Sequence, residues 1–226
     1  MAQYVKTNWL ERVGDGALKR TGTPNNICGA LWALSQSTDN THIPIPIRIG
    51  GRTALEYHGF GHNITFQANL FLLFGNPDQT LPKWFWHTTW DHKFTFVRTS
   101  CFPFVEQQEM TIQNCTVIVS SPEQAILEAC YLAPKQQDLE ELRNFMASLT
   151  SLRSHIVQRL LKDCTSIKAK RLFLFLAHQY QHPWIKDLDE QYIDLGTGKR
   201  HIVSGILDKR YNLTLPRDWF DDTEPF

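Results

Sequence analysis

The sequence predicts a mixed α/β (α+β) fold, in which a sheet-containing domain with a helical C-terminal half follows a short N-terminal β-hairpin. Three observations predict it. Two short runs flank a Gly-Asp-Gly turn near the N-terminus, apolar and β-branched runs occupy the middle of the chain, and helical patterns fill residues 121–179. We expect the boundary near Asn26, which divides the chain into segments 1–26 and 27–226. At 226 residues the chain can bury a good core.

The hairpin is expected within residues 9–20, because Gly14-Asp15-Gly16 supplies the positive φ angles that a tight turn needs. Four basic residues lie in or beside its strands: Lys6, Arg12, Lys19 and Arg20. A two-stranded hairpin is marginal in water, so it must pack on another element. A basic hairpin after a helix is typical of the wing of a winged helix-turn-helix, a DNA-binding unit. We then expect its first helices to lie before the first residue, with residues 2–7 as the end of the recognition helix; an ordinary edge hairpin is the alternative.

The middle of the chain alternates between helical and strand-like runs. Residues 27–35 predict a short apolar helix, and a run at 47–49 leads through Gly50-Gly51 into a helix near 53–58, which Gly59 ends. Residues 37–46 predict a polar loop. Strands are expected at 64–74, 83–97 and 115–119, where β-branched and aromatic residues are frequent.

The C-terminal half begins with a strong helix start. Ser121 is a helix cap, Pro122 suits the first helical position, and Gln124 follows three residues after the cap, as in a capping box. We therefore expect a helix over 123–132 and three more amphipathic helices at 138–149, 151–164 and 167–179. The tail from residue 192 to residue 215 predicts short β-like runs around turns.

Composition excludes several classes of protein. Lys plus Arg equals Asp plus Glu, 23 each, so the net charge is zero and any nucleic-acid binding would depend on a local patch. No run is long and apolar enough to cross a bilayer, and residues 1–10 lack a secretory signal. We expect a cytoplasmic protein that does not bind membranes. Its five cysteines lack Cys-x-x-Cys spacing and are expected to be buried thiols.

Catalytic motifs are incomplete. His58 and His62 have helical ligand spacing, but Gly59 and Gly61 interrupt the helix that would align them. No serine has the flanking glycines of a nucleophile elbow. We expect no catalytic residue, no metal site and no cofactor. The alternative is a metal-dependent nuclease or nucleotide-processing enzyme, for which the acidic candidates are Asp187, Asp189 and Asp194, with Glu190 and Lys199 nearby.

Two further groups of residues allow two interpretations each. Seven basic residues form local patches on separate segments: Lys168, Lys170, Arg171, Lys199, Arg200, Lys209 and Arg210. If the patches converge in the fold, they make a surface that suits phosphate backbones or an acidic protein. If they do not converge, they are ordinary solvated charges. Six aromatic residues predict core packing with one or two exposed rings, and base stacking beside Lys83 and Lys93 is the alternative: Trp84, Phe85, Trp86, Trp90, Phe94 and Phe96.

Taken in order, five phrases make the chain similar to the AbiEi family of antitoxins nearly end to end. Each phrase is weak alone, but their order and spacing over some 200 residues are specific. They are the phrases at 9–14 (WLERVG), 50–59 (GGRTALEYHG), 120–128 (SSPEQAILE), 168–174 (KAKRLFL) and 207–211 (LDKRY).

The resemblance implies a transcriptional regulator of a type IV toxin–antitoxin system, linked to abortive infection of phage-attacked bacteria. In this family an N-terminal winged helix represses the operon, and a larger domain counters a nucleotidyltransferase-like toxin without a stable complex. The implied partners are operator DNA and that toxin. Because the helices before the wing are expected to be absent, we expect impaired DNA binding, with phosphate contacts from Lys6, Arg12, Lys19 and Arg20.

Overall fold

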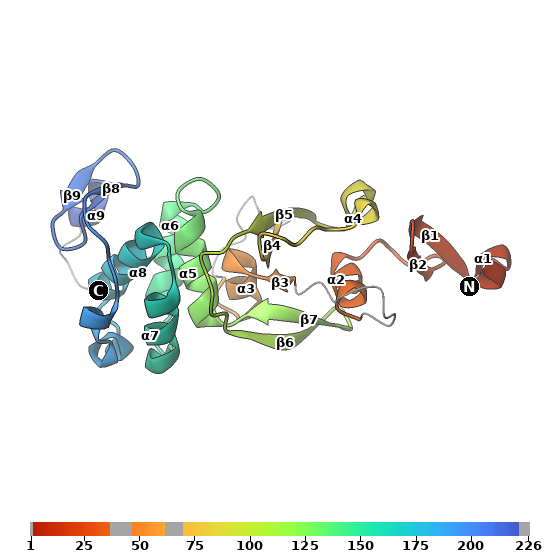
Figure 1. Cartoon of the computed structure of the whole chain (residues 1–226), viewed down its shortest axis with the longest axis horizontal. Coiled ribbons are helices and arrows are strands. Elements are labelled where there is room, and N and C mark those ends of the chain that lie inside the picture. Colours follow the sequence, from red (N-terminus) through yellow and green to blue (C-terminus); the bar gives the residue numbers. More distant parts are fainter. Residues whose placement is uncertain (1, 37–46, 62–69, 222–226) are drawn as a thin grey trace.

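The computed structural model describes residues 2–36, 47–61 and 70–221, and it confirms the mixed α/β class. Figure 1 shows an elongated molecule. An N-terminal helix and hairpin lie at one end, a mixed sheet lies in the middle, and helices with a small C-terminal sheet form the other end. Within the described residues, no helix combines the length and apolarity needed to span a bilayer.

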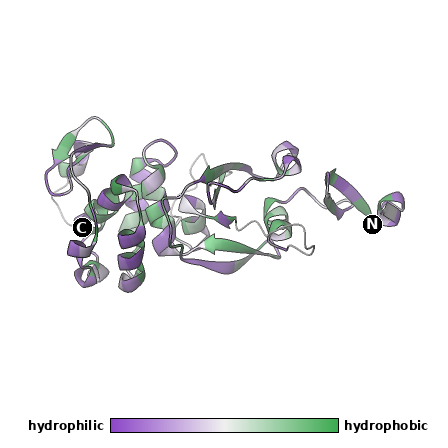
Figure 2. Ribbon diagram, viewed as in Figure 1, coloured by the Kyte–Doolittle hydropathy of each residue, from purple (hydrophilic) through white to green (hydrophobic). Residues whose placement is uncertain are grey.

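The expected hairpin is present. Strands β1 (Leu10–Gly14) and β2 (Ala17–Arg20) pair antiparallel around Asp15 and Gly16, and Gly16 has the positive φ of +78° that this tight turn requires. Helix α1 (Ala2–Lys6) precedes it, in agreement with the helix expected over residues 2–7. Figure 2 shows that this N-terminal part is mainly hydrophilic.

The hairpin packs on helix α4 (Lys83–His87) of the sheet domain. At this contact Gly14 lies so close to Trp84 that a Cβ at position 14 would clash with the Cβ of Trp84. The segment that follows the hairpin is also hydrogen-bonded to Asp91: Asp91 N donates to Asn25 O at 2.9 Å, and Ile27 N donates to Asp91 Oδ1 at 3.0 Å. The hairpin therefore gains the packing partner that an isolated hairpin lacks.

The central sheet has the strand order β5-β4-β3-β7-β6. Pairs β3–β7 and β4–β5 are parallel, whereas β3–β4 and β6–β7 are antiparallel. Its strands are β3 (Arg48–Ile49), β4 (Leu70–Gly75), β5 (Lys93–Arg98), β6 (Gln107–Ile112) and β7 (Cys115–Ser120). Strand β7 confirms the run expected at 115–119. Strand β4 confirms the later part of the run expected at 64–74, while 64–69 and the loop expected at 37–46 lie outside the described residues.

The strand run expected at 83–97 is confirmed only in its last part, by β5, because Lys83–His87 forms helix α4. Phe85 N donates to Pro82 O, and both the backbone and the hydroxyl of Thr88 donate to Trp84 O. A helical turn directs successive rings to different neighbours: Trp84 contacts the hairpin, Phe85 is fully buried, and Trp86 stays exposed. Tertiary packing thus overrides the strand propensity of these aromatic residues.

The helices follow the sequence closely. Helix α2 (Ile27–Ser35) covers strand β7, and α3 (Gly51–Tyr57) follows β3. Ser121 Oγ accepts from Gln124 N at the start of α5, as expected, but the Gln124 side chain bonds to Glu128 instead of closing a capping box. The C-terminal helices are α5 (Pro122–Leu132), α6 (Leu139–Ser148), α7 (Ser154–Asp163) and α8 (Ile167–Gln179).

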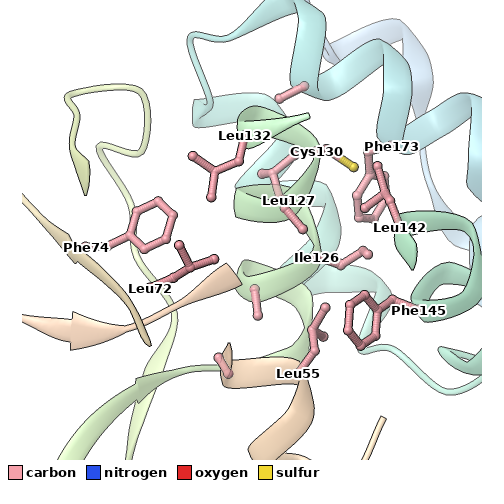
Figure 3. Close-up of a cluster of buried hydrophobic side chains, with 14 of the residues drawn as sticks. Leu55, Leu72, Phe74, Ile126, Leu127, Cys130, Leu132, Leu142, Phe145 and Phe173 are labelled. Carbon is pink, nitrogen blue, oxygen red and sulfur yellow. The ribbon is translucent and has the colours of Figure 1, made fainter. Parts of the chain in front are cut away.

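Helix α5 lies at the centre of the core. Figure 3 shows Leu72 and Phe74 of the sheet on one side of α5 and Leu142, Phe145 and Phe173 of the helical layer on the other. Both sides of α5 are therefore apolar, as its nearly continuous burial requires. The last described residues form two 3-10 turns, a three-stranded sheet and a short helix: Pro183–Asp187, Glu190–Tyr192, β8 (Arg200–His201), β9 (Ile206–Asp208), β10 (Leu213–Leu215) and α9 (Asp218–Asp221).

A buried ionic network ties α5 to the sheet. The Glu128 carboxylate, which has no exposed surface, accepts hydrogen bonds from Arg48 at 2.8 Å and from Gly51 N–H at 2.8 Å. Ser120 Oγ and Gln124 Nε2 donate to it at 3.1 and 3.0 Å. Since a buried charge is costly without partners, these four donors explain how a carboxylate is tolerated in the core.

A second ionic contact joins the start of α5 to α7. The backbone N–H and the guanidinium of Arg153 donate to the buried carboxylate of Glu123 at 2.9–3.1 Å. Burial is the largest single effect and raises the pKa of Glu123, but the hydrogen bonds from Arg153, together with those from the Glu123 backbone and Ser121, outweigh it and lower the pKa from 4.5 to about 2. The interaction therefore stabilises the fold only while Glu123 is ionised.

We expect Glu128→Gln to lower the free energy of unfolding by about 3–5 kcal/mol, because it leaves Arg48 as a buried charge without a counterion. Urea denaturation followed by far-UV circular dichroism measures this. Asp163→Asn is the matched control, since Asp163 pairs with Arg159 at 3.8 Å on the surface and should contribute about 1 kcal/mol or less. Equal losses in the two variants would contradict the prediction.

We expect the stability difference between wild type and Glu123→Gln to depend on pH. A lowered pKa in the folded state stabilises above the ordinary value of 4.5, and that contribution is lost as pH falls toward 2. The difference should reach up to about 3 kcal/mol near neutral pH and shrink in acid. Urea denaturation at a series of pH values tests this, and a difference that is constant with pH would contradict it.

Candidate nucleic-acid interface

The helix and hairpin at the N-terminal end carry the four basic residues expected to contact phosphate. Lys6 is exposed in the last turn of α1. Arg20 pairs across the strands with Leu10, and Arg12 pairs with Leu18, so Arg12 and Arg20 share one face of the hairpin. Both arginines are exposed. The hairpin therefore brings two guanidinium groups to the same face.

Lys19 lies on the opposite face from these arginines. It is paired across the strands with Glu11, and its amino group contacts Glu11 Oε1 at 2.9 Å. The same amino group donates to Thr23 O at 2.6 Å. Because its charge is partly neutralised inside the hairpin, Lys19 has less to offer to phosphate than Arg12 or Arg20.

Sequence reasoning missed two exposed aromatic rings in this unit. Tyr4 and Trp9 have 58% and 66% of their surface exposed, and Trp9 N donates to Tyr4 O at 3.0 Å. Large exposed rings beside basic groups are typical of binding surfaces. The small size of this unit could have predicted that both rings are exposed, because a short helix and a two-stranded hairpin cannot bury two large rings.

The first cluster of the expected basic surface is largely buried, with only Lys168 half-buried. Lys170 and Arg171 are each only 2% exposed. Arg171 donates to the carbonyl oxygens of Leu195, Gly196 and Gly198 at 2.7–2.9 Å, which anchors the C-terminal segment to α8. Lys168 donates to Tyr131 O and Ala133 O at the end of α5. Helix α8 packs into the core over most of its surface, so Lys170 and Arg171 are not available to an external phosphate or protein.

The second cluster is exposed but divided. Lys199 and Arg200 lie at β8, and Lys209 and Arg210 follow β9, with β10 between those strands. Arg210 is bound to Glu190 at 3.0 Å. The small sheet thus places the two pairs at opposite edges, at the far end of the molecule from the hairpin (Figure 1).

Of the acidic residues considered for nuclease chemistry, Asp189, Asp194 and Glu190 have local roles, and Asp187 is exposed at the end of the first 3-10 turn. Asp189 caps the second 3-10 turn, and Asp194 accepts from Gly196 N at 2.8 Å. Glu190 bonds to His178 at 2.6 Å as well as to Arg210. His58 bonds through Nε2 to Ser120 O, while His62 lies outside the described residues. In the described ranges no three metal-ligating side chains are grouped.

The fold is similar to that of a known structure. The crystal structure of the RV2827C protein from Mycobacterium tuberculosis matches 94% of this chain and 77% of its own chain, with a TM-score of 0.61. Sequence identity is 10%, so the likeness concerns the fold alone. A comparison with curated proteins finds no match.

Two family models together span most of the chain. Residues 1–66 match the N-terminal domain of the AbiEi antitoxin transcriptional regulators, and residues 68–216 match the model described as "Transcriptional regulator, AbiEi antitoxin, Type IV TA system". The family's N-terminal domain is therefore present, and the expected loss of its first helices is not confirmed. The chain belongs to the AbiEi family of transcriptional regulators, the antitoxins of type IV toxin–antitoxin systems.

Proposed function

We propose that this protein represses its own operon by binding operator DNA through α1 and the hairpin, and that it counters a nucleotidyltransferase-like toxin in the cytoplasm. The observation that carries the proposal is the exposed basic set Lys6, Arg12 and Arg20 at one end of a regulator of this family. Residues 2–24 contain four basic and two acidic residues, whereas the whole chain is neutral. The positive charge that DNA requires is thus concentrated at this end.

The hairpin chemistry suits phosphate contacts. Arginine presents a planar set of donors that matches phosphate oxygens, and the cross-strand register places Arg12 and Arg20 on one face as diagonal neighbours. Exposed Tyr4 and Trp9 add flat rings next to these charges. Such contacts orient a protein on the duplex, and sequence is read by groups that reach base edges.

The toxin-directed function is assigned to the larger domain. It includes the whole helical half, which lies away from the hairpin (Figure 1). In accordance with the family, we propose that neutralisation proceeds without a stable complex between the two proteins. The metal-dependent nuclease alternative has no assembled site in its favour among the described residues.

We expect the double variant Arg12→Ala/Arg20→Ala to bind the upstream DNA of its own gene more weakly and with a shallower salt dependence. Loss of two phosphate contacts should reduce the slope of log K against log salt by about 2. Fluorescence anisotropy with a labelled duplex measures both quantities. The control is Lys162→Ala/Lys186→Ala, which removes two exposed lysines distant from the hairpin. Equal slopes for the two double variants would contradict the assignment of the arginines.

We expect the same arginine double variant to keep rescuing cells from the co-expressed neighbouring toxin, because the DNA-binding end and the larger domain carry different functions. Growth after toxin induction measures rescue, with an empty vector as the control. Size-exclusion chromatography of the two purified proteins should show separate peaks. Failure of the wild-type chain to rescue growth would reject the antitoxin proposal, and a shared peak would reject neutralisation without a complex.

A further inference from the structure

Helix α4 belongs to the sheet domain but adjoins the hairpin. Strand β1 packs directly against it, and Gly14 provides the space that the Trp84 side chain fills. The segments on either side of this contact are joined as well, since Asn25 Nδ2 donates to Thr89 O at 3.0 Å and Asp91 N donates to Asn25 O. In Figure 1, α4 lies next to the hairpin at the N-terminal end of the molecule.

The orientation of α4 leaves one face uncovered. Phe85 is fully buried in the core and Trp84 lies against Gly14, while Lys83, Trp86 and His87 are exposed. Positions i, i+3 and i+4 share a face of a helix, so these three residues form one surface, which we call the α4 face. The packing of Trp84 and Phe85 fixes the direction of the α4 face.

Trp86 is the most unusual member of the α4 face. Its indole is 54% exposed, although it sits among rings that pack into the core. The Phe94 ring lies 5.1 Å from it and supports one side of the indole. A supported ring that remains open on its other side is a typical anchor for a partner, because little conformational freedom is lost on binding.

The chain segment that contains the α4 face carries no negative charge. No acidic residue occurs between Asp78 and Asp91, a stretch that contains the whole helix. Asp91 is already engaged by the backbone N–H of Ile27 and by His92. Lys83 therefore shares the α4 face with Trp86 in a segment of the chain that contains no carboxylate.

From these observations we infer that the α4 face is a second DNA-contacting surface, which binds the sugar-phosphate backbone of the same duplex that the hairpin binds. Lys83 supplies the phosphate contact, and Trp86 packs on the adjoining sugars. The sheet domain thereby takes part in operator binding through a surface whose position is set by the contact between Gly14 and Trp84. This inference rests on the proposed DNA binding and extends it to a second element.

The test uses the full chain, a labelled duplex of its own upstream DNA, and single variants of the α4 face. We expect Lys83→Ala to reduce the slope of log K against log salt by about 1. Trp86→Ala should weaken binding about fivefold or more at fixed salt with an unchanged slope, and Trp86→Phe should recover part of the loss. The matched controls, Lys162→Ala and Tyr192→Ala, replace exposed residues distant from the hairpin and should behave as wild type.

The outcomes separate this inference from the proposed function. If Arg12→Ala/Arg20→Ala weakens binding but Lys83→Ala and Trp86→Ala match the wild type in affinity and slope, the α4 face is not a DNA contact and the hairpin still is. If the wild-type chain does not bind the duplex, both proposals fail. Losses in both sets of variants, with intact thermal unfolding and unaffected controls, support the second surface.

Discussion

The Glu128 carboxylate is the point at which the main structural layers meet. Its donors come from β3, from the start of α3, from the end of β7 and from α5 itself. A charge in this position is tolerable only if all its partners are in place, so the network favours one arrangement of strand and helix. Gly50 belongs to the same constraint, because a Cβ at position 50 would clash with the carboxylate. The packing of α5 between the sheet and the helical layer depends on this arrangement.

A second constraint governs the end that we propose to bind DNA. The hairpin has no core of its own. Its position is fixed by the contact between Gly14 and Trp84 of α4 and by the hydrogen bonds of Asn25. The side chains that would meet DNA are thus oriented by two levels of structure. The cross-strand register places Arg12 and Arg20 on one face of the hairpin and Lys19 on the other. The packing of the hairpin on α4 then fixes the direction of the arginine face relative to the larger domain.

Local signals predicted much of this fold. The Gly-Asp-Gly turn identified the hairpin, and the Ser121-Pro122 start identified α5, because both depend on backbone chemistry that single residues control. Signals that depend on tertiary packing failed. Aromatic residues at 83–87 suggested a strand but form a helix, and Arg171 suggested surface charge but is buried against backbone carbonyls. The basic residues of the hairpin were found from composition, yet their division between two faces required the register.

The elongated shape bears on how the two roles of such a regulator can coexist. The hairpin, which we propose to bind DNA, and the C-terminal sheet lie at opposite ends of the molecule, with the central sheet and the helical layer between them (Figure 1). A molecule seated on an operator would still present its far end to solvent, so occupancy of one end does not sterically block the other. With the proposed division of roles, operator binding and toxin neutralisation would therefore be separable by mutation.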